Sequence, residues 1–75
     1  MATVDELKPV KRKYSADLLR LPGVSGVDID IKKSGEAVLT VHLDTKDPKV
    51  REALPDQLDG FPVKYVYTGP IRKLG

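Results

Sequence analysis

Cysteine and tryptophan are absent from this 75-residue chain, which has a single histidine, His42. Without cysteine the chain has no disulfide, no thiolate metal ligand and no thiol nucleophile. With one imidazole it has no His-Glu-x-x-His zinc motif and no multi-histidine site. Long apolar runs and a basic, apolar leader are also missing, so we expect neither a membrane span nor a signal peptide. These absences predict a cytoplasmic protein without metal or cofactor.

The composition is that of a small folded domain. Hydrophobic residues make up 40% of the chain and charged residues 32%, which is typical of globular chains. We expect one domain over residues 1–75, with residues 1–8 as a loose lead-in and residues 71–75 as a tail. A chain this short buries only about 60% of its unfolded surface, so packing against a partner chain would offset the small core. The formal net charge of +2 is too balanced for a dedicated polyanion binder.

A helix is predicted in the first part of the chain. Thr3 begins a T-x-x-E capping box, and apolar residues then recur at spacings of three and four. Because Pro9 fits best at the first helical position, we predict that the well-formed helix runs from about Pro9 to Arg20; a shorter helix with Ser15 as N-cap is the alternative. Residues 22–26 end the helix with a proline and a left-handed glycine and turn the chain. The apolar stripe consists of Leu7, Val10, Tyr14, Leu18 and Leu21.

Two segments with a period of two follow and predict a hairpin. Apolar and polar residues alternate in residues 27–31 and again in residues 37–43, so each strand has one wet face. A two-residue loop would mix the two faces, whereas a three-residue loop at residues 33–35 keeps apolar residues opposite one another and places Gly35 at a left-handed position. The predicted pairs are Ile31 with Ala37, Ile29 with Leu39, and Val27 with Val41.

A second helix and a third strand are predicted in the remaining chain. Asp47 is a typical N-cap and Pro48 suits the first helical position of a short helix in residues 47–54. A strand follows in residues 61–68, with Pro62 on an edge or before regular pairing begins, because proline cannot donate to a ladder. The residues of its expected core face are Phe61, Val63, Tyr65 and Tyr67.

The order helix, strand, strand, helix, strand indicates a small α+β fold. We predict a three-stranded, mostly antiparallel sheet with both helices on its apolar face and the other face open. This αββαβ order resembles a ferredoxin-like sandwich that lacks its first strand. The missing strand leaves either a rearranged sheet or an unfilled edge, and an unfilled edge invites a partner strand.

The open sheet face holds the candidate interaction residues of the chain. Asp28 and Asp30 project from the same face about 7 Å apart, and His42 is a diagonal neighbour of Asp28 in the predicted register. Together with Thr40 they form a candidate interaction face. Two carboxylates and an imidazole can bind a divalent metal or act as acid and base, but a flat face lacks the walls that desolvate a reacting group. We therefore predict no catalytic, cofactor-binding or metal-binding residue.

Basic and aromatic residues raise a second possibility, nucleic acid. Tyr65 and Tyr67 on the last strand could stack on bases, although their alternation with apolar residues favours the core or its rim. Phosphate binding by a basic cluster also needs a groove or companion aromatic side chains. The candidate basic patch consists of Lys8, Lys11, Arg12 and Lys13.

Two segments of the chain resemble a known family. Residues 18–31 read LLRLPGVSGVDIDI, and residues 53–72 read ALPDQLDGFPVKYVYTGPIR. They are similar to a small bacterial domain of uncharacterised function that occurs alone or in front of trypsin-like serine peptidase domains. Its pattern is L-P-G-V-x-G-V, then L-P-x-x-L-D-G-x-P-V, then T-G-x-I-R. The resemblance implies a binding or regulatory module without catalytic residues. The family often has G-V-G-V-G where this chain has Val27-Asp28-Ile29-Asp30.

The helix and hairpin also resemble a heavy-metal-associated domain, whose Cys-x-x-Cys loop binds copper. The absence of cysteine excludes a copper-chaperone role. From the sequence we expect a non-enzymatic interaction or regulatory module that acts through a sheet edge, the open face or self-association. Its partner would be a protein or a second copy of the chain. The alternatives are a weak nucleic-acid binder and an accessory domain or subunit of an enzyme.

Overall fold

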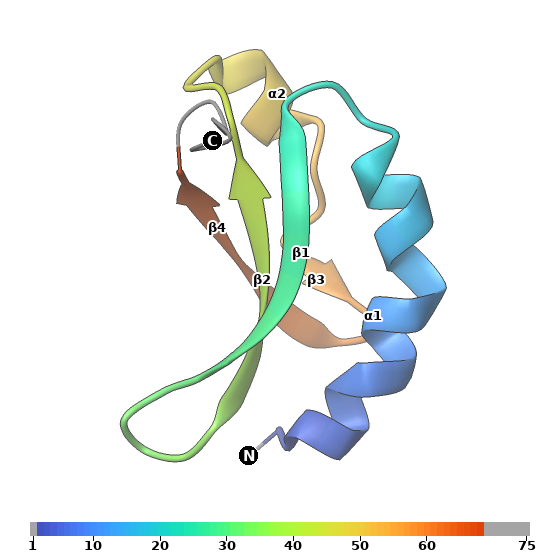
Figure 1. The fold of residues 1–75 in the computed structure, drawn as a ribbon, viewed down its shortest axis with the longest axis vertical. Helices are drawn as coiled ribbons and strands as arrows, with labels where there is room; N and C mark the ends of the chain where they lie inside the picture. Colours follow the sequence, from blue (N-terminus) through green and yellow to red (C-terminus); the bar gives the residue numbers. More distant parts are fainter. Residues whose placement is uncertain (1, 69–75) are drawn as a thin grey trace, which may run out of the picture.

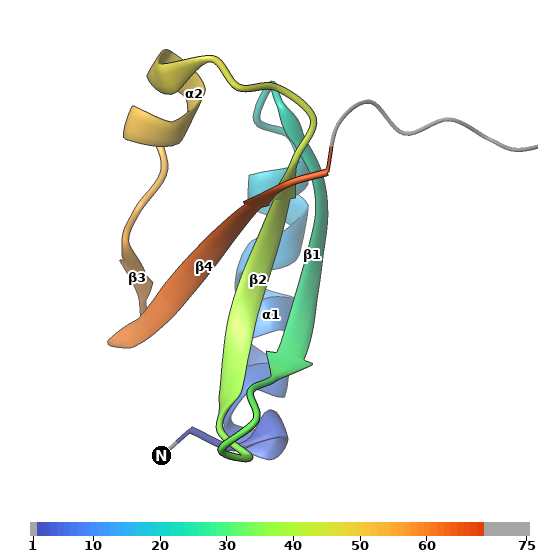
Figure 2. The same ribbon diagram turned by 90° about the vertical axis from the view of Figure 1, so that its left-hand side faces the viewer.

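The chain folds as two helices and a four-stranded mixed sheet (Figure 1). The structure is a computed structural model that describes residues 2–68, so the predicted tail at residues 71–75 lies outside the described residues. The sheet order is β1-β2-β4-β3. Figure 2 shows α1 behind one face of the sheet. No helix in the described part is long and apolar enough to cross a membrane. The elements are α1 (Val4–Leu19), β1 (Val24–Ile31), β2 (Ala37–Leu43), α2 (Pro48–Glu52), β3 (Gln57–Leu58) and β4 (Phe61–Tyr67).

Helix α1 begins at Val4, so the prediction of a loose lead-in followed by a helix from Pro9 is wrong at this end. The Thr3 side chain accepts a hydrogen bond from the Glu6 amide at 3.2 Å, and Glu6 Oε1 accepts one from the Thr3 amide at 3.0 Å. This capping box satisfies two amides, and Leu7, 1% exposed, anchors the first turn in the core. Pro9 is exposed within the helix, where its missing N–H leaves one carbonyl to water.

The predicted hairpin register between β1 and β2 is confirmed for all three apolar pairs. Gly35 has φ +89° in the predicted loop, and the Lys32 amide donates to the Glu36 carbonyl at 2.8 Å. β1 begins earlier than predicted, at Val24, with a register shift between Val24 and Gly26. There the Ser25 hydroxyl donates to the His42 carbonyl at 3.2 Å, which holds the irregular residue in the sheet. The prediction of a turn at residues 24–26 is therefore wrong.

Strand β4 pairs in parallel with β2, from Leu39 opposite Val63 to Leu43 opposite Tyr67. Of the two outcomes expected for the missing strand, the structure has the rearranged sheet, because β4 lies directly beside β2. Pro62 precedes the first of these pairs, as predicted, so its missing N–H disrupts no bond to β2.

The fourth strand, β3, was not predicted from the sequence. It pairs with the start of β4 through a two-residue turn in which Asp59 has φ +52° and Gly60 has φ +83°. Two positive φ values are typical of the tight hairpin turn that Asp-Gly favours, so this dipeptide is the sequence signal for β3.

The core lies between α1 and the sheet face that α1 covers. Leu39 and Val41 of β2 are fully buried at its centre. The prediction that both helices cover this face is correct for α1, whereas α2 has no buried residue of its own. Leu54, directly after α2, enters the core instead, and Val50 packs at its margin. The buried residues of the central cluster of this core are Val10, Leu18, Val24, Val27, Leu39, Val41, Leu43, Leu54 and Leu58.

We expect Gly23→Ala to destabilise the protein more than Gly35→Ala. Both glycines have left-handed φ angles, +87° and +89°, which cost an alanine about 1 kcal/mol or more. A Cβ at Gly23 would also lie 2.7 Å from Thr45 Cγ2 and 2.9 Å from Val50 Cγ1, whereas a Cβ at Gly35 meets nothing within 4 Å. Urea unfolding of both variants should give a loss at Gly23 that exceeds the loss at Gly35 by about 1 kcal/mol or more. Equal losses would contradict the close packing of this corner.

Candidate interaction surface at the edge of strand β1

The four residues of the predicted interaction face lie together on the sheet face away from α1. The Thr40 hydroxyl donates to Asp30 Oδ2 at 2.9 Å, and His42 Nε2 lies 3.2 Å from Asp28 Oδ2. In each pair the β1 carboxylate reaches its diagonal neighbour on β2. Thr40 is fully buried, so its side chain supports Asp30 and presents no surface to a partner.

These two pairs satisfy each other and do not converge on a common point. Each β1 carboxylate already has a partner on β2, and both are drawn over the sheet. Within residues 2–68, no group of three His, Cys, Asp or Glu side chains is placed to hold a metal ion. These contacts hold the two carboxylates over the open face, so neither carboxylate covers the outer side of β1.

The outer side of β1 presents main-chain groups without a strand partner. Because the Lys32 amide donates to Glu36 on the β2 side, the even-numbered residues from 28 to 32 direct their N–H and C=O toward β2. Successive strand residues direct these groups to opposite sides, so those of Val27, Ile29 and Ile31 point away from β2. β1 ends the sheet order, and no strand in the described chain pairs with this side. We call these three residues the β1 edge.

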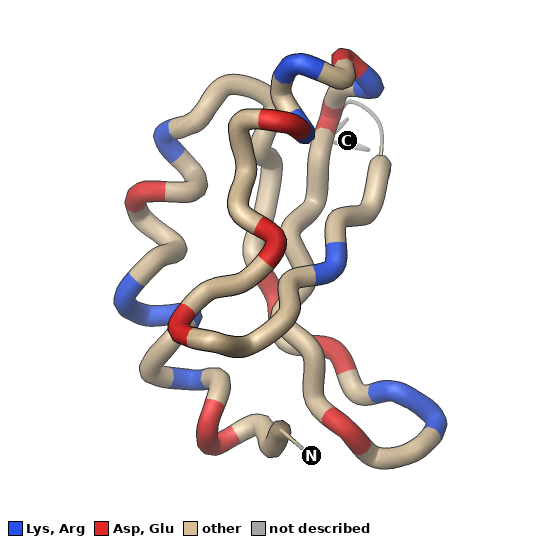
Figure 3. Tube along the Cα trace, turned by 180° about the vertical axis from the view of Figure 1, so that it is seen from behind, with Lys and Arg blue, Asp and Glu red and all other residues tan. Residues whose placement is uncertain are grey.

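The predicted basic patch divides between the two sides of α1. Lys13 Nζ lies 3.6 Å from Asp59 Oδ2, on the side of α1 toward β3 and β4. Figure 3 shows this side, with basic positions of α1 across from acidic positions around β3. Counted at 100° per residue from the buried stripe of α1, Lys8 and Lys11 fall on the opposite side, toward β1, whereas Arg12 points away from the sheet. We call Lys8 and Lys11 the basic flank.

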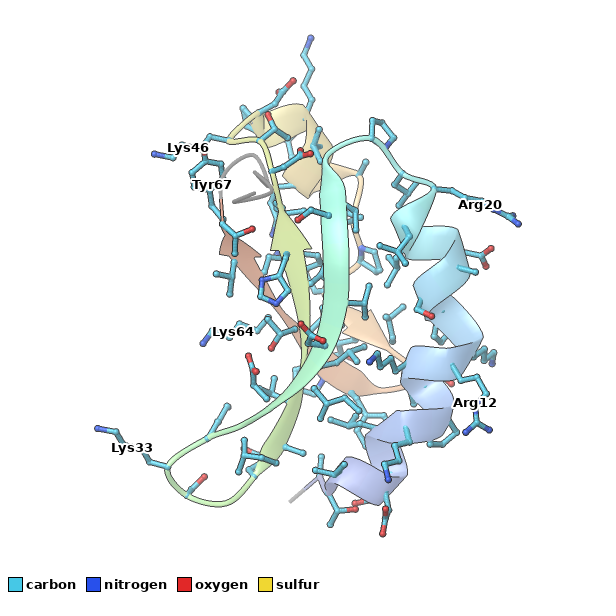
Figure 4. The ribbon with its side chains drawn as sticks, in the orientation of Figure 1. Arg12, Arg20, Lys33, Lys46, Lys64 and Tyr67 are labelled. Carbon is cyan, nitrogen blue, oxygen red and sulfur yellow. The ribbon has the colours of Figure 1, made fainter. Side chains whose placement is uncertain are left out.

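The contacts of Lys13 separate it further from the basic flank. The Tyr14 hydroxyl donates to Asp59 Oδ1 at 2.6 Å, and Lys13 Nζ lies 5.2 Å from the Tyr14 ring centroid. The hydrogen bond with Tyr14 and the charge of Asp59 raise the pKa of Lys13. In the basic flank, Lys8 has one long ion pair, 3.8 Å from Asp5 Oδ1. Figure 4 shows Arg12 on the side of α1 that faces away from the sheet, so it belongs to neither group.

The two tyrosines of β4 occupy different surroundings. Tyr65 is half-buried, donates from its hydroxyl to the Pro55 carbonyl at 2.5 Å, and lies under the Arg51 guanidinium, 4.2 Å from the ring centroid. Tyr67 is 46% exposed, so the prediction that its ring joins the core is wrong. It ends the strand beside Lys46, whose Nζ lies 4.9 Å from its ring centroid (Figure 4). The rings therefore do not form one stacking platform.

A shallow apolar hollow of about 240 Å³ lies between the corner after α1 and helix α2. The apolar stripe predicted for the first helix includes Leu21, whereas Leu21 is 39% exposed in the structure, so this hollow was not predicted. The hollow shares no residue with the predicted interaction face. Its lining residues are Leu21, Pro22, Lys49, Val50, Ala53 and Leu54.

The environment of Tyr65 gives a test at alkaline pH. Burial raises the pKa of Tyr65 above its usual value, while Arg51 lowers it and Asp56 raises it. Because the unfolded chain loses this proton first, the stability contributed by the neutral phenol is present below about pH 10 and is lost as pH rises through the folded pKa. We expect the difference in free energy of unfolding between the wild type and Tyr65→Phe to shrink between pH 8 and pH 11 in chemical denaturation. A constant difference would contradict the burial of this hydroxyl.

Comparison with known proteins found no significant relative of this chain. No family model matches the chain, and neither a curated protein nor a solved structure is significantly similar to it. The resemblances drawn from the LPGVSGV and LPDQLDGFPV segments therefore stay predictions.

Proposed function

We propose that this chain is a non-enzymatic interaction module that binds an extended protein segment by strand addition at the β1 edge. The observation that carries the proposal is the outward direction of the N–H and C=O groups of Val27, Ile29 and Ile31, which have no strand partner in the described chain. Main-chain hydrogen bonds give affinity in this mode of recognition. Ile31, 57% exposed, adds apolar surface beside these groups.

The edge also lacks the features that usually prevent strand pairing. Edge strands are commonly blunted by proline, by inward-pointing charges, by bulges or by a covering loop. β1 contains no proline, and its irregularity lies at Val24–Gly26, outside the outward-facing set. Asp28 and Asp30 are held toward β2 by His42 and Thr40. The five residues from Val27 to Ile31 therefore form a regular and accessible template.

The other side of the sheet is less suited to this role. The Val63 amide already donates to the Asp56 carbonyl at 3.0 Å, and β3 pairs with the start of β4. The Tyr65 hydroxyl holds the Pro55 carbonyl, so the segment before β3 runs along β4. The unfilled edge, one of the two outcomes expected for the missing strand, is absent from the described sheet, because β4 lies directly beside β2. The proposal therefore concerns β1 alone.

Amide hydrogen exchange followed by NMR tests the proposed edge. In the free protein we expect the amides of Ile29 and Ile31 to exchange about a hundredfold faster than those of Asp28 and Asp30, which face β2. An added extended peptide should protect the two isoleucine amides. If they are already protected in the free protein, the edge is occupied and the proposal fails.

Ile31→Pro supplies a variant test of the same edge. It removes one outward amide that the β1–β2 ladder does not use, so the variant should keep its fold while peptide binding falls at least about tenfold. Ile31→Val is the matched control, because it keeps the amide and should bind within about twofold of the wild type. Titration of ¹⁵N-labelled protein measures both the fold and the affinity. Unchanged binding by Ile31→Pro would contradict strand addition.

A further inference from the structure

We infer that the segment bound at the β1 edge carries acidic side chains on the side that faces α1, and that a second copy of this chain is not its occupant. This inference rests on the proposed strand addition and adds the chemistry of the partner. Its basis is the basic flank, Lys8 and Lys11, on the side of α1 toward the β1 edge.

The basic flank lies at the level of the β1 edge along the strand direction. α1 has 16 residues and rises about 24 Å, and β1 has 8 residues and extends about 26 Å, so the two elements match in length. The Ala37 amide donates to the Ala2 carbonyl at 2.9 Å, which places the start of α1 beside the Ile31 end of β1. Counting along both elements puts Lys8 between the levels of Asp28 and Ile29, and Lys11 near that of Val27.

Side chains alternate between the two faces of a strand, so every second side chain of an added strand lies beneath the basic flank. Its residues opposite Ile29 and Ile31 share the sheet face that α1 covers, because directly opposite residues point to the same face. A glutamate there can lay its methylene groups on these isoleucines and direct its carboxylate to Lys8 or Lys11. Ile31 is exposed and Lys8 has only the long contact with Asp5, so both are available for such contacts.

The other face of the added strand lies beside charges that are already paired. Its side chains lie next to Asp28 and Asp30, which are already paired with His42 and Thr40. The charge requirement therefore falls mainly on the side facing α1. The chemistry that fits is an extended peptide with Asp or Glu at alternate positions.

A second copy of the chain does not meet this requirement. Antiparallel pairing of two β1 edges about a twofold axis brings the basic flank of one copy toward the same flank of the other. In the register that pairs Ile29 with its own copy, Asp28 lies opposite Asp30 on both sides of the axis. Like charges directly opposite one another disfavour a strand pair and serve to reject a wrong partner.

The experiment uses the full chain and two capped eight-residue peptides, one alternating Glu with Thr and the other alternating Lys with Thr. We expect the Glu peptide to bind at least about tenfold more tightly at low salt, to protect the amides of Ile29 and Ile31, and to lose affinity as salt is added. Protection of these amides by the Lys peptide with equal or higher affinity would overturn the acidic preference and leave strand addition intact. Protection by neither peptide, nor by a neutral Val-Thr peptide, would overturn both.

Lys11→Gln and Lys13→Gln form a matched pair of variants on the same helix. Lys11→Gln should weaken binding of the Glu peptide about threefold, and Lys8→Gln combined with Lys11→Gln about tenfold. Lys13→Gln should leave the affinity within about 1.5-fold, because Lys13 faces Asp59. Equal effects of Lys11→Gln and Lys13→Gln would overturn the assignment of the basic flank to this site.

Two further measurements test the other candidate occupants of the β1 edge, a polyanion and a second copy of the chain. A Glu peptide with proline at every second position cannot pair as a strand, and its equal binding, or equal binding of a single-stranded oligonucleotide at the same residues, would show a general polyanion site and overturn the inference. Light scattering at increasing protein concentration should show a monomer. A dimer that Ile31→Pro dissociates would assign the edge to a second copy and overturn the inference.

Discussion

The burial of strand β2 at the centre of the sheet is the constraint on which the rest of the molecule depends. Leu39 and Val41 are fully buried against α1, and Thr40 between them is fully buried on the opposite face. β1 pairs with one side of β2 and β4 with the other, so β2 leaves no edge of its own. A slip of one residue would reverse both faces at once, which explains why the loop with Gly35 and the Lys32–Glu36 contact matter to the whole fold.

This central position of β2 also decides where the accessible surfaces lie. With β2 enclosed and β4 partly covered by β3, the unpaired main-chain groups of the described sheet gather on β1. The open face contributes indirectly, because His42 and Thr40 of β2 hold the carboxylates of Asp28 and Asp30 away from that edge. The residues predicted as an interaction face therefore support the neighbouring β1 edge.

Positive charge lies on the α1 side of the β1 edge. The basic residues of α1 are consecutive or nearly so in sequence, yet the helix period directs Lys13 toward Asp59 and leaves Lys8 and Lys11 on the side toward β1. A helix that packs over β1 places this flank above any strand that joins the sheet there. The β1 edge thus presents unpaired main-chain groups next to the basic flank of α1.

Local patterns in the sequence determined the hairpin, its register, the left-handed glycines at positions 23 and 35, the cap of α2 and the delayed pairing at Pro62, because each depends on neighbours within a few residues. The capping box at Thr3 marks the start of α1, but the prediction gave more weight to Pro9, whose cost inside the helix is outweighed by the burial of Leu7. Strand β3 was missed although Asp59-Gly60 marks its turn, because a two-residue strand has no periodicity to read. Only the tertiary structure decided that β4 closes the gap beside β2, that Tyr67 stays outside the core, and that the basic residues of α1 separate, because these depend on contacts between residues far apart in the chain.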